Sequence, residues 1–223
     1  ILLGIRRQDA MLLALHLRFI MQGGSSSLSK FVGYDKGKFI GQRISLYGRR
    51  VNLPMFQFDG ITDLFASRFR GRIHILVYES LRDDTAGCVS TMCNFLREPT
   101  PPKFTDDILT REFGFYQLAI TRMLNPFVTS SMNPDGLIPY IRVRNGIKRP
   151  VTDILRHELV RRVFSYLPKD KIVMPQRMSQ AILEYYSSSN SYLNAKWDLG
   201  LDNWGYILTT KAGHQNKSFK NGD

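Results

Sequence analysis

Apolar residues along the chain occur in two patterns, short continuous runs and runs with helical spacing. The apolar run at residues 1–5 stops at two arginines, and helical spacing follows to about residue 20, which predicts a strand, a turn and a helix. The run at 73–78 is nearly continuous and rich in β-branched residues, as buried parallel strands are. The pattern predicts further helices over 56–69, 84–96, 108–124, 151–166 and 178–197.

This order of elements predicts an α/β fold with an open parallel sheet covered by helices on both faces. Residues 24–50 mix Gly, Ser, Lys and aromatic residues without sustained periodicity, and they are predicted to form a long surface excursion. Residues 1–208 are expected to form one domain, and residues 209–223 a mobile tail. Because the chain opens directly on a core strand, we expect an N-terminal portion to precede it.

Composition narrows the class of protein. The 223 residues are 43% hydrophobic and 22% charged, which argues against a disordered chain or a fibre. The longest apolar runs are far shorter than the roughly 20 residues that cross a bilayer. A formal charge of +12 predicts an anionic partner or substrate. The two cysteines, Cys88 and Cys93, are expected to be free buried thiols.

Two arginines, Arg6 and Arg7, directly follow the first predicted strand and precede a helix. Ligands of open α/β sheets bind at the carboxyl ends of strands, and a guanidinium beside a helix N-terminus suits a phosphate or a sulfate. The alternative is that both are solvated loop arginines. Spacing alone leaves the two interpretations open.

Three blocks of sequence resemble the sulfotransferases that use 3′-phosphoadenosine 5′-phosphosulfate, in particular the bacterial carbohydrate-type branch. The first block is GIRRQD at residues 4–9, a strand-to-helix turn. The second, FASRFRGRIHILVYESLRDDTAGCVSTMCNFL at 65–96, resembles that family's helix, basic turn, strand, Tyr-Glu-x-Leu and helix. The third, ILEYYSSSNSYLNAKWDLGLDNWGY at 182–206, resembles its closing helix. The blocks lie in the family's order.

The resemblance implies a three-layer α/β/α fold like that of P-loop nucleotide kinases, and 3′-phosphoadenosine 5′-phosphosulfate as the donor with no metal. Arg6 takes the place of the arginine that binds the donor's 3′-phosphate, and Arg7 is a second cation at the same strand end. Arg111 corresponds to a basic residue of a late loop that closes over the donor. Glu79 corresponds to a glutamate that we expect to organise nearby loops. The acceptor implied is a hydroxyl group, expected on a carbohydrate.

The chain departs from the family in two places. Ala14 stands eight residues after Arg6, where the family has a serine that binds the 3′-phosphate. The family's phosphosulfate-binding loop, which precedes the first strand, has no counterpart in residues 1–223, and the Gly-Gly-Ser-Ser run at 23–26 follows a helix instead. The chain is therefore expected to be either the C-terminal portion of an enzyme or a relative that keeps the fold without the chemistry.

Three classes of function are consistent with the sequence. The first is a sulfotransferase, the second is a non-catalytic subunit of a larger assembly with a protein partner, and the third is a basic nucleic-acid-binding module. The third class is disfavoured because the chain has no ribonucleoprotein aromatic motif, zinc-finger spacing or Gly-x-x-Gly loop. A cleft for an anionic polysaccharide would draw on the basic residues Arg43, Arg49, Arg50, Arg68, Arg70, Arg72, Arg142, Arg144, Lys148 and Arg149.

None of the four histidines stands beside a nucleophile or partner acid in a recognisable triad. His16 is expected to pack inside the fold, and His74 to lie on a core or surface face of its strand. The general base of a transfer reaction is therefore expected in the portion that precedes residue 1.

Overall fold

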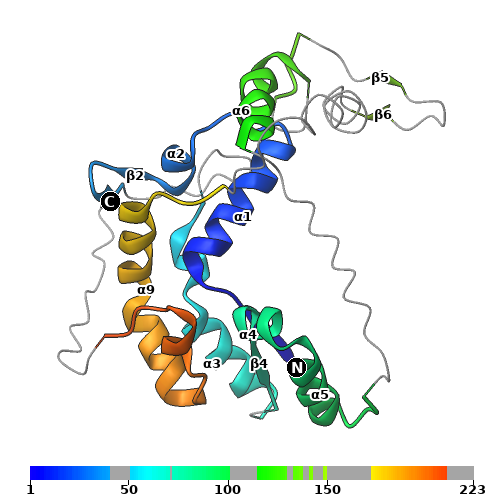
Figure 1. The fold of residues 1–223 in the computed structure, drawn as a ribbon, viewed down its shortest axis with the longest axis vertical. Coiled ribbons are helices and arrows are strands. Elements are labelled where there is room, and N and C mark those ends of the chain that lie inside the picture. Colours follow the sequence, from blue (N-terminus) through cyan, green and yellow to red (C-terminus); the bar gives the residue numbers. More distant parts are fainter. Residues whose placement is uncertain are drawn as a thin grey trace.

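The computed structural model describes residues 1–40, 51–70, 72–100, 115–129, 133–137, 141–142, 148–149 and 172–209. Over these ranges the chain is a mixed α/β protein that contains more helix than strand (Figure 1). The α-helices are α1 (Gln8–Met21), α2 (Leu28–Val32), α3 (Phe58–Arg68), α4 (Tyr78–Asp83), α5 (Thr85–Leu96), α6 (Phe115–Leu124) and α9 (Gln176–Trp197). Short 3-10 helices are η1 (Leu53–Phe56), η2 (Asn125–Phe127) and η4 (Leu201–Trp204). The strands are β1 (Leu2–Ile5), β2 (Tyr34–Asp35), β3 (Lys38–Phe39), β4 (His74–Val77), β5 (Ile141–Arg142) and β6 (Lys148–Arg149).

Strands β1 and β4 form a two-stranded parallel sheet, although about 70 residues separate them in sequence. The register pairs Leu2 with His74 and Ile5 with Val77. Both strands were predicted from their apolar runs, and their parallel pairing is confirmed. The register has a direct consequence for function, because the residues after Ile5 and after Val77 emerge side by side at one edge of the sheet.

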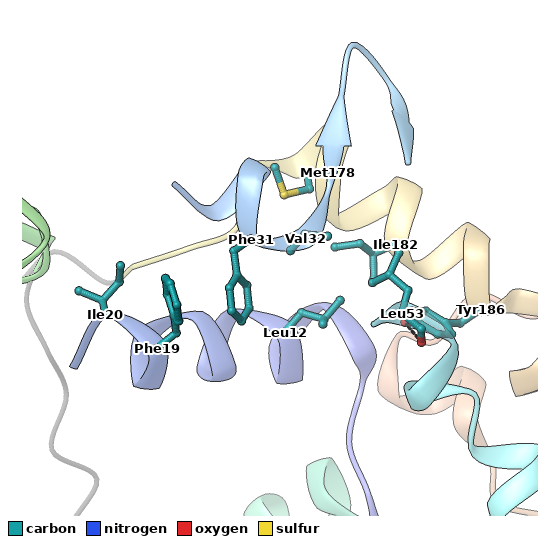
Figure 2. Packing of buried hydrophobic residues seen from close by; sticks show 9 residues of the cluster. All are labelled: Leu12, Phe19, Ile20, Phe31, Val32, Leu53, Met178, Ile182 and Tyr186. Carbon is teal, nitrogen blue, oxygen red and sulfur yellow. Dashed lines mark hydrogen bonds between the residues drawn. The ribbon is translucent and has the colours of Figure 1, made fainter. Parts of the chain in front are cut away.

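Helix α1 packs against α2 and the first half of α9 around a core of nine buried side chains (Figure 2). The members of this core are Leu12, Phe19, Ile20, Phe31, Val32, Leu53, Met178, Ile182 and Tyr186. The buried residues Leu12, His16 and Phe19 of α1 recur three, four and seven positions apart, so they lie on one face of the helix. Burial of that face holds α1 in place and fixes the direction in which β1 enters it.

A second core forms around the sheet. Its buried members are Ile5, Phe58, Ile73, Ile75, Val77, Leu193, Leu201 and Tyr206. Helix α9 contributes Ile182 to the first core and Leu193 to the second. At 22 residues the helix is about 33 Å long, so it reaches both cores. It therefore positions the C-terminal segment against the sheet.

Buried polar pairs fix α9 against α1 and α3. The side-chain amides of Gln8 and Asn190, both fully buried, bond reciprocally, with N–O distances of 2.7 and 3.3 Å. The Ser189 hydroxyl donates to the Asp59 carboxylate at 2.8 Å. Because a buried amide is stable only when both its oxygen and its nitrogen are bonded, this reciprocal pairing specifies one alignment of α9 on α1.

The prediction of an irregular excursion over residues 24–50 was wrong for the part that the structure describes. Ser27 caps α2 by accepting the Lys30 N–H at 3.4 Å, and Gly33 ends that helix at a positive φ of 73°. The β2–β3 hairpin follows, with its turn at Lys36–Gly37. Segments this short carry too little periodicity to be detected in sequence. Residues 41–50 lie outside the described ranges.

Most of the predicted helices are observed in the structure. Tyr78 was assigned to the second strand, but it begins α4, a short helix that the sequence pattern missed between β4 and α5. Asp84 caps α5 by accepting the Gly87 N–H at 2.9 Å, as expected from its position. The helix predicted over 108–124 is observed as α6, with its first residues outside the described part of the chain. The helix predicted over 151–166 lies outside it altogether.

The two cysteines are free, but they are not buried as predicted. Both are half-buried, because α5 packs mainly against α4 and β4 and none of its residues is fully buried. Among the described residues, no helix is both long enough and apolar enough to cross a bilayer.

Candidate anion-binding site

A cavity of about 310 Å³ opens at the carboxyl ends of β1 and β4. Since Ile5 pairs with Val77, the next residues along the two strands also meet: Arg6 comes beside Tyr78, and Arg7 beside Glu79. Ala10 of α1, Arg82 and Asp83 of α4, and the C-terminal turn Asn203–Gly205 complete the lining. All three sequence blocks therefore contribute to one cavity.

The Arg6 guanidinium lies over an aromatic ring at this cavity. Its guanidinium carbon is 4.5 Å from the centre of the Tyr78 ring, a cation–π contact. The Arg6 Nε is buried and has no hydrogen-bond partner among the described residues. A buried N–H without an acceptor costs about 1–3 kcal/mol.

Arg7 is held by the protein itself. Its Nε and Nη2 donate to the two carboxylate oxygens of Asp9 at 2.8 and 3.2 Å, and its Nη1 donates to the Trp204 carbonyl at 3.4 Å. The hydrogen bond to Asp9 is the main reason that the pKa of Arg7 is raised above its ordinary value. The side chain keeps 34% of its exposure, so the outer face of its guanidinium still borders the cavity.

Glu79 ties three segments together beside the arginines. Its Oε1 accepts the backbone N–H of Arg7 at 3.0 Å, and its Oε2 accepts the Tyr206 hydroxyl at 3.2 Å. Burial, and then the negative charge of Glu79, raise the pKa of Tyr206, which therefore keeps its proton and donates. These contacts are those of a residue that organises loops, which is the part expected for Glu79.

Gly205 closes the C-terminal side of the cavity. Its φ of +75° favours glycine, and a Cβ at this position would lie 2.8 Å from Arg7 Nη1. The turn can approach Arg7 closely only because the residue has no side chain. A larger residue here would displace either the turn or the guanidinium.

Arg82 adds a third cation at the mouth of the cavity. Its side chain is 76% exposed, and its Nε lies 3.9 Å from Asp83, a contact too long to immobilise it. Within the cavity Arg7 is neutralised largely by Asp9 and Glu79, whereas Arg6 has no carboxylate partner among the described residues. Arg6 and Arg82 are therefore the cations available to an anion.

The structure places one of the sequence-derived positions away from this cavity and does not describe another. Arg111 lies outside the described residues. Ala14 follows Ala10 by one helical turn and does not line the cavity, which Ala10 does. The Gly23–Gly24 pair lies at the opposite end of α1, where the Gly24 N–H bonds to the Phe19 carbonyl at 2.9 Å, so it ends a helix rather than cradling a ligand.

The basic residues before β4 do not join the cavity. Arg68, Arg70 and Arg72 are exposed at the amino end of β4, whereas Arg6 and Arg7 follow the carboxyl end of β1. Because the strands are parallel, these two groups lie at opposite ends of the sheet. Arg43, Arg49, Arg50 and Arg144 lie outside the described residues, and Arg142, Lys148 and Arg149 lie in the β5–β6 hairpin.

His16 packs inside the fold, as expected. It is 3% exposed, its Nε2 lies 3.0 Å from the Ser26 carbonyl, and its ring contacts Phe19 and Phe31. Burial lowers the pKa of His16, and the Ser26 carbonyl opposes that shift only in part. His74 is half-buried on the face of β4, where its ring lies 5.4 Å from that of Phe95.

The lowered pKa of His16 makes a prediction for stability. Below about pH 6.5 the histidine of the unfolded chain binds a proton that the folded chain resists, so acidification favours unfolding. We expect the free energy of unfolding to fall less steeply from about pH 7 to about pH 5 in His16→Gln than in the wild type, as measured by urea unfolding. The matched control is His74→Gln. Equal pH slopes for His16→Gln and the wild type would contradict the prediction.

Sequence reasoning missed Tyr78, Arg82 and Asn203 as parts of the site. Tyr78 had a detectable signal, since it follows β4 as directly as Arg6 follows β1. Asp9 was noted only as part of the turn, although an acid two residues after Arg7 suits the first turn of a helix. Among the described residues, no group of three or more His, Cys, Asp or Glu side chains is arranged to hold a metal ion.

Comparison of the chain with family models, with curated proteins and with solved structures gives no match in any of the three. The likeness to the sulfotransferases therefore stays a prediction from the three sequence blocks.

Proposed function

We propose that this chain is a sulfotransferase and binds the phosphate groups of 3′-phosphoadenosine 5′-phosphosulfate at the carboxyl ends of β1 and β4. The observation that carries the proposal is Arg6, which lines a cavity bordered by two further arginines and whose guanidinium has no hydrogen-bond or carboxylate partner among the described residues. An oxygen of a bound phosphate would accept hydrogen bonds from this guanidinium. The same oxygen would also bring a negative charge to the cation that lacks a carboxylate.

The site is organised in advance of binding. Tyr78 lies under the Arg6 guanidinium, and Asp9 holds the Arg7 guanidinium through two hydrogen bonds. Because a planar guanidinium binds a phosphate through a fork of N–H groups, a fixed plane lowers the entropy lost on binding. Arg82 is exposed and adjustable, so it closes on the anion from the solvent side.

In this proposal the β1–β4 pair is part of a larger parallel sheet in a three-layer α/β/α fold of the P-loop nucleotide-kinase type. Such sheets bind nucleotides outside the carboxyl ends of their strands, which is where Arg6 and Arg7 lie. The sulfuryl group passes from the donor to an acceptor hydroxyl, on a carbohydrate by resemblance. Arg6 anchors the donor, Arg7 is a second cation held beside it by Asp9, and neither acts on the sulfur.

The test is calorimetric titration of the chain with adenosine 3′,5′-bisphosphate, the product of the donor. Since a charge-assisted hydrogen bond contributes about 1.5–3 kcal/mol, we expect Arg6→Ala to weaken binding about tenfold to a hundredfold or beyond detection. The matched control is Arg177→Ala, which removes an exposed arginine in the first turn of α9.

The result separates the three classes of function. Binding by the wild type that Arg6→Ala removes and Arg177→Ala keeps supports the donor site. Equal affinities for Arg6→Ala and the wild type would refute the site assignment. Failure of the wild type to bind, together with salt-sensitive binding to RNA, would favour the nucleic-acid class. Binding to neither would favour a non-catalytic subunit.

A further inference from the structure

We infer that the free edge of β4 is a docking site for an extended peptide of a partner protein, which adds to the sheet as a strand and carries basic residues at its ends. This site adjoins the cavity at the strand ends, and the two share Trp204 in their linings. It is a groove of about 600 Å³ along the whole of β4, here called the β4 groove. Its walls are α5 and the segment from Trp197 to Trp204, and no described residue of β1 lines it.

The backbone of β4 presents hydrogen-bonding groups to this groove. The His74 N–H donates to the Ile1 carbonyl at 2.8 Å, so the backbone N–H and C=O groups of His74 point toward β1. In a parallel ladder the backbone groups of successive residues point to opposite edges of the strand. Those of Ile73 and Ile75 therefore point toward the groove. Among the described residues neither has a backbone partner on that side. An edge of this kind is a template for another strand.

The side walls suit an inserted strand. His74 faces α5, where it contacts Phe95, whereas Ile75 and Val77 face the second core. A strand added beside β4 would therefore lie between α5 on one face and Trp197 on the other. Trp197 lines the groove, so its ring would pack against the inserted strand.

The charged residues that line the β4 groove indicate which kind of peptide would bind there. The chain carries a formal charge of +12, yet the described lining of the β4 groove contains Asp84 and Asp198 and neither Lys nor Arg. This local reversal of sign favours a peptide with cationic ends.

The probe is an acetylated and amidated hexapeptide, Lys-Val-Thr-Val-Thr-Lys, with valines for the Trp197 side and threonines for the α5 side. Both tryptophans of the chain, Trp197 and Trp204, line the groove, so intrinsic fluorescence reports its occupancy. We expect a saturable change in fluorescence and protection of the Ile75 amide from hydrogen exchange. The same peptide N-methylated at its central residues should bind at least about tenfold more weakly, because it cannot complete the ladder.

Two pairs of variants localise the binding. Thr91→Arg places a long cation in the groove and should abolish binding, whereas Asn94→Arg, exposed on the same helix but outside the groove, should keep it. Asp198→Asn should weaken binding about threefold, because it removes a negative charge from the groove. The backbone should be unchanged, because asparagine tolerates the left-handed conformation of this residue at φ 49°. Asp202→Asn, outside the groove, is its control.

Several results would overturn the inference. They are the lack of a saturable fluorescence change up to about millimolar peptide, equal binding of the N-methylated peptide, and binding that Thr91→Arg leaves intact. A concentration-dependent dimer that Thr91→Arg dissociates would assign the edge to a second copy instead. None of these measurements depends on the binding of a nucleotide.

Discussion

Replacement of Asp9 by alanine is expected to lower the free energy of unfolding by about 3 kcal/mol, because it breaks a largely buried ion pair. Asp9 is 5% exposed. Its carboxylate accepts two hydrogen bonds from Arg7, one from the Ser179 hydroxyl at 2.6 Å and one from the Ala10 N–H at 2.7 Å. The variant leaves Arg7 half-buried with only the Trp204 carbonyl as an acceptor.

Urea unfolding followed by far-UV circular dichroism measures this loss. Asp83→Ala is the control, because the Asp83 side chain is 58% exposed, and its effect should stay within about 0.5 kcal/mol. A double-mutant cycle with Arg7→Ala identifies the pair, and the double variant should lose less than the sum of the single variants. Additive losses would show that the two side chains do not stabilise one another.

Truncation of the α1–α9 core is the second prediction with a large effect. Leu12 and Ile182 are fully buried, and they lie in the same cluster between the two helices (Figure 2). Leu12→Ala and Ile182→Ala each remove buried methyl groups and leave a cavity that the packed helices cannot close. We expect each variant to lose about 2–5 kcal/mol of unfolding free energy.

The control for these variants is Leu64→Ala on α3, since Leu64 is 55% exposed. It should change the unfolding free energy by less than about 0.5 kcal/mol. Losses near this small value for Leu12→Ala or Ile182→Ala would contradict the packing of α9 on α1. The slope of unfolding free energy against urea should stay constant, which would show that the variants change stability and not the compactness of either state.

These two sets of variants also bear on the candidate site. Asp9 holds Arg7, and the packing of α1 holds the strand-to-helix turn that carries Arg6 and Arg7. The free energy that fixes the cations therefore comes from contacts outside the cavity. A site built in this way loses ligand affinity when its support is removed, so titrations of the Asp9 and Leu12 variants need to be made well below their unfolding midpoints.

Part of this arrangement could be predicted from local pattern. The runs at 1–5 and 73–78 identify β1 and β4, and the helical spacing of apolar residues identifies α1, α3, α5 and α9. The capping role of Asp84 follows from its place before a helix. Arg6 and Arg7 stand at a strand end in the sequence itself. Such features depend on neighbours within one or two turns, which a sequence displays directly.

Other features depend on register and packing between distant segments. The cation–π contact of Arg6 with Tyr78 follows from the pairing of Ile5 with Val77, and the bond of Glu79 with Tyr206 follows from where α9 ends. Short elements such as α2 and α4 have too few residues for a period to show. The half-burial of the cysteines reflects how little packs on α5.

The sequence by itself determined the two strands, the main helices and the basic turn at the strand end, because each of these follows from the period of apolar residues and from local capping. Only the tertiary structure decided that Arg7 is bound to Asp9 while the Arg6 Nε finds no acceptor among the described residues. It also decided that one edge of β4, beside a groove lined by Asp84 and Asp198, pairs with no strand in the described part of the chain. The physical reason is that hydrogen-bond partners and burial are set by segments that meet only when the chain folds.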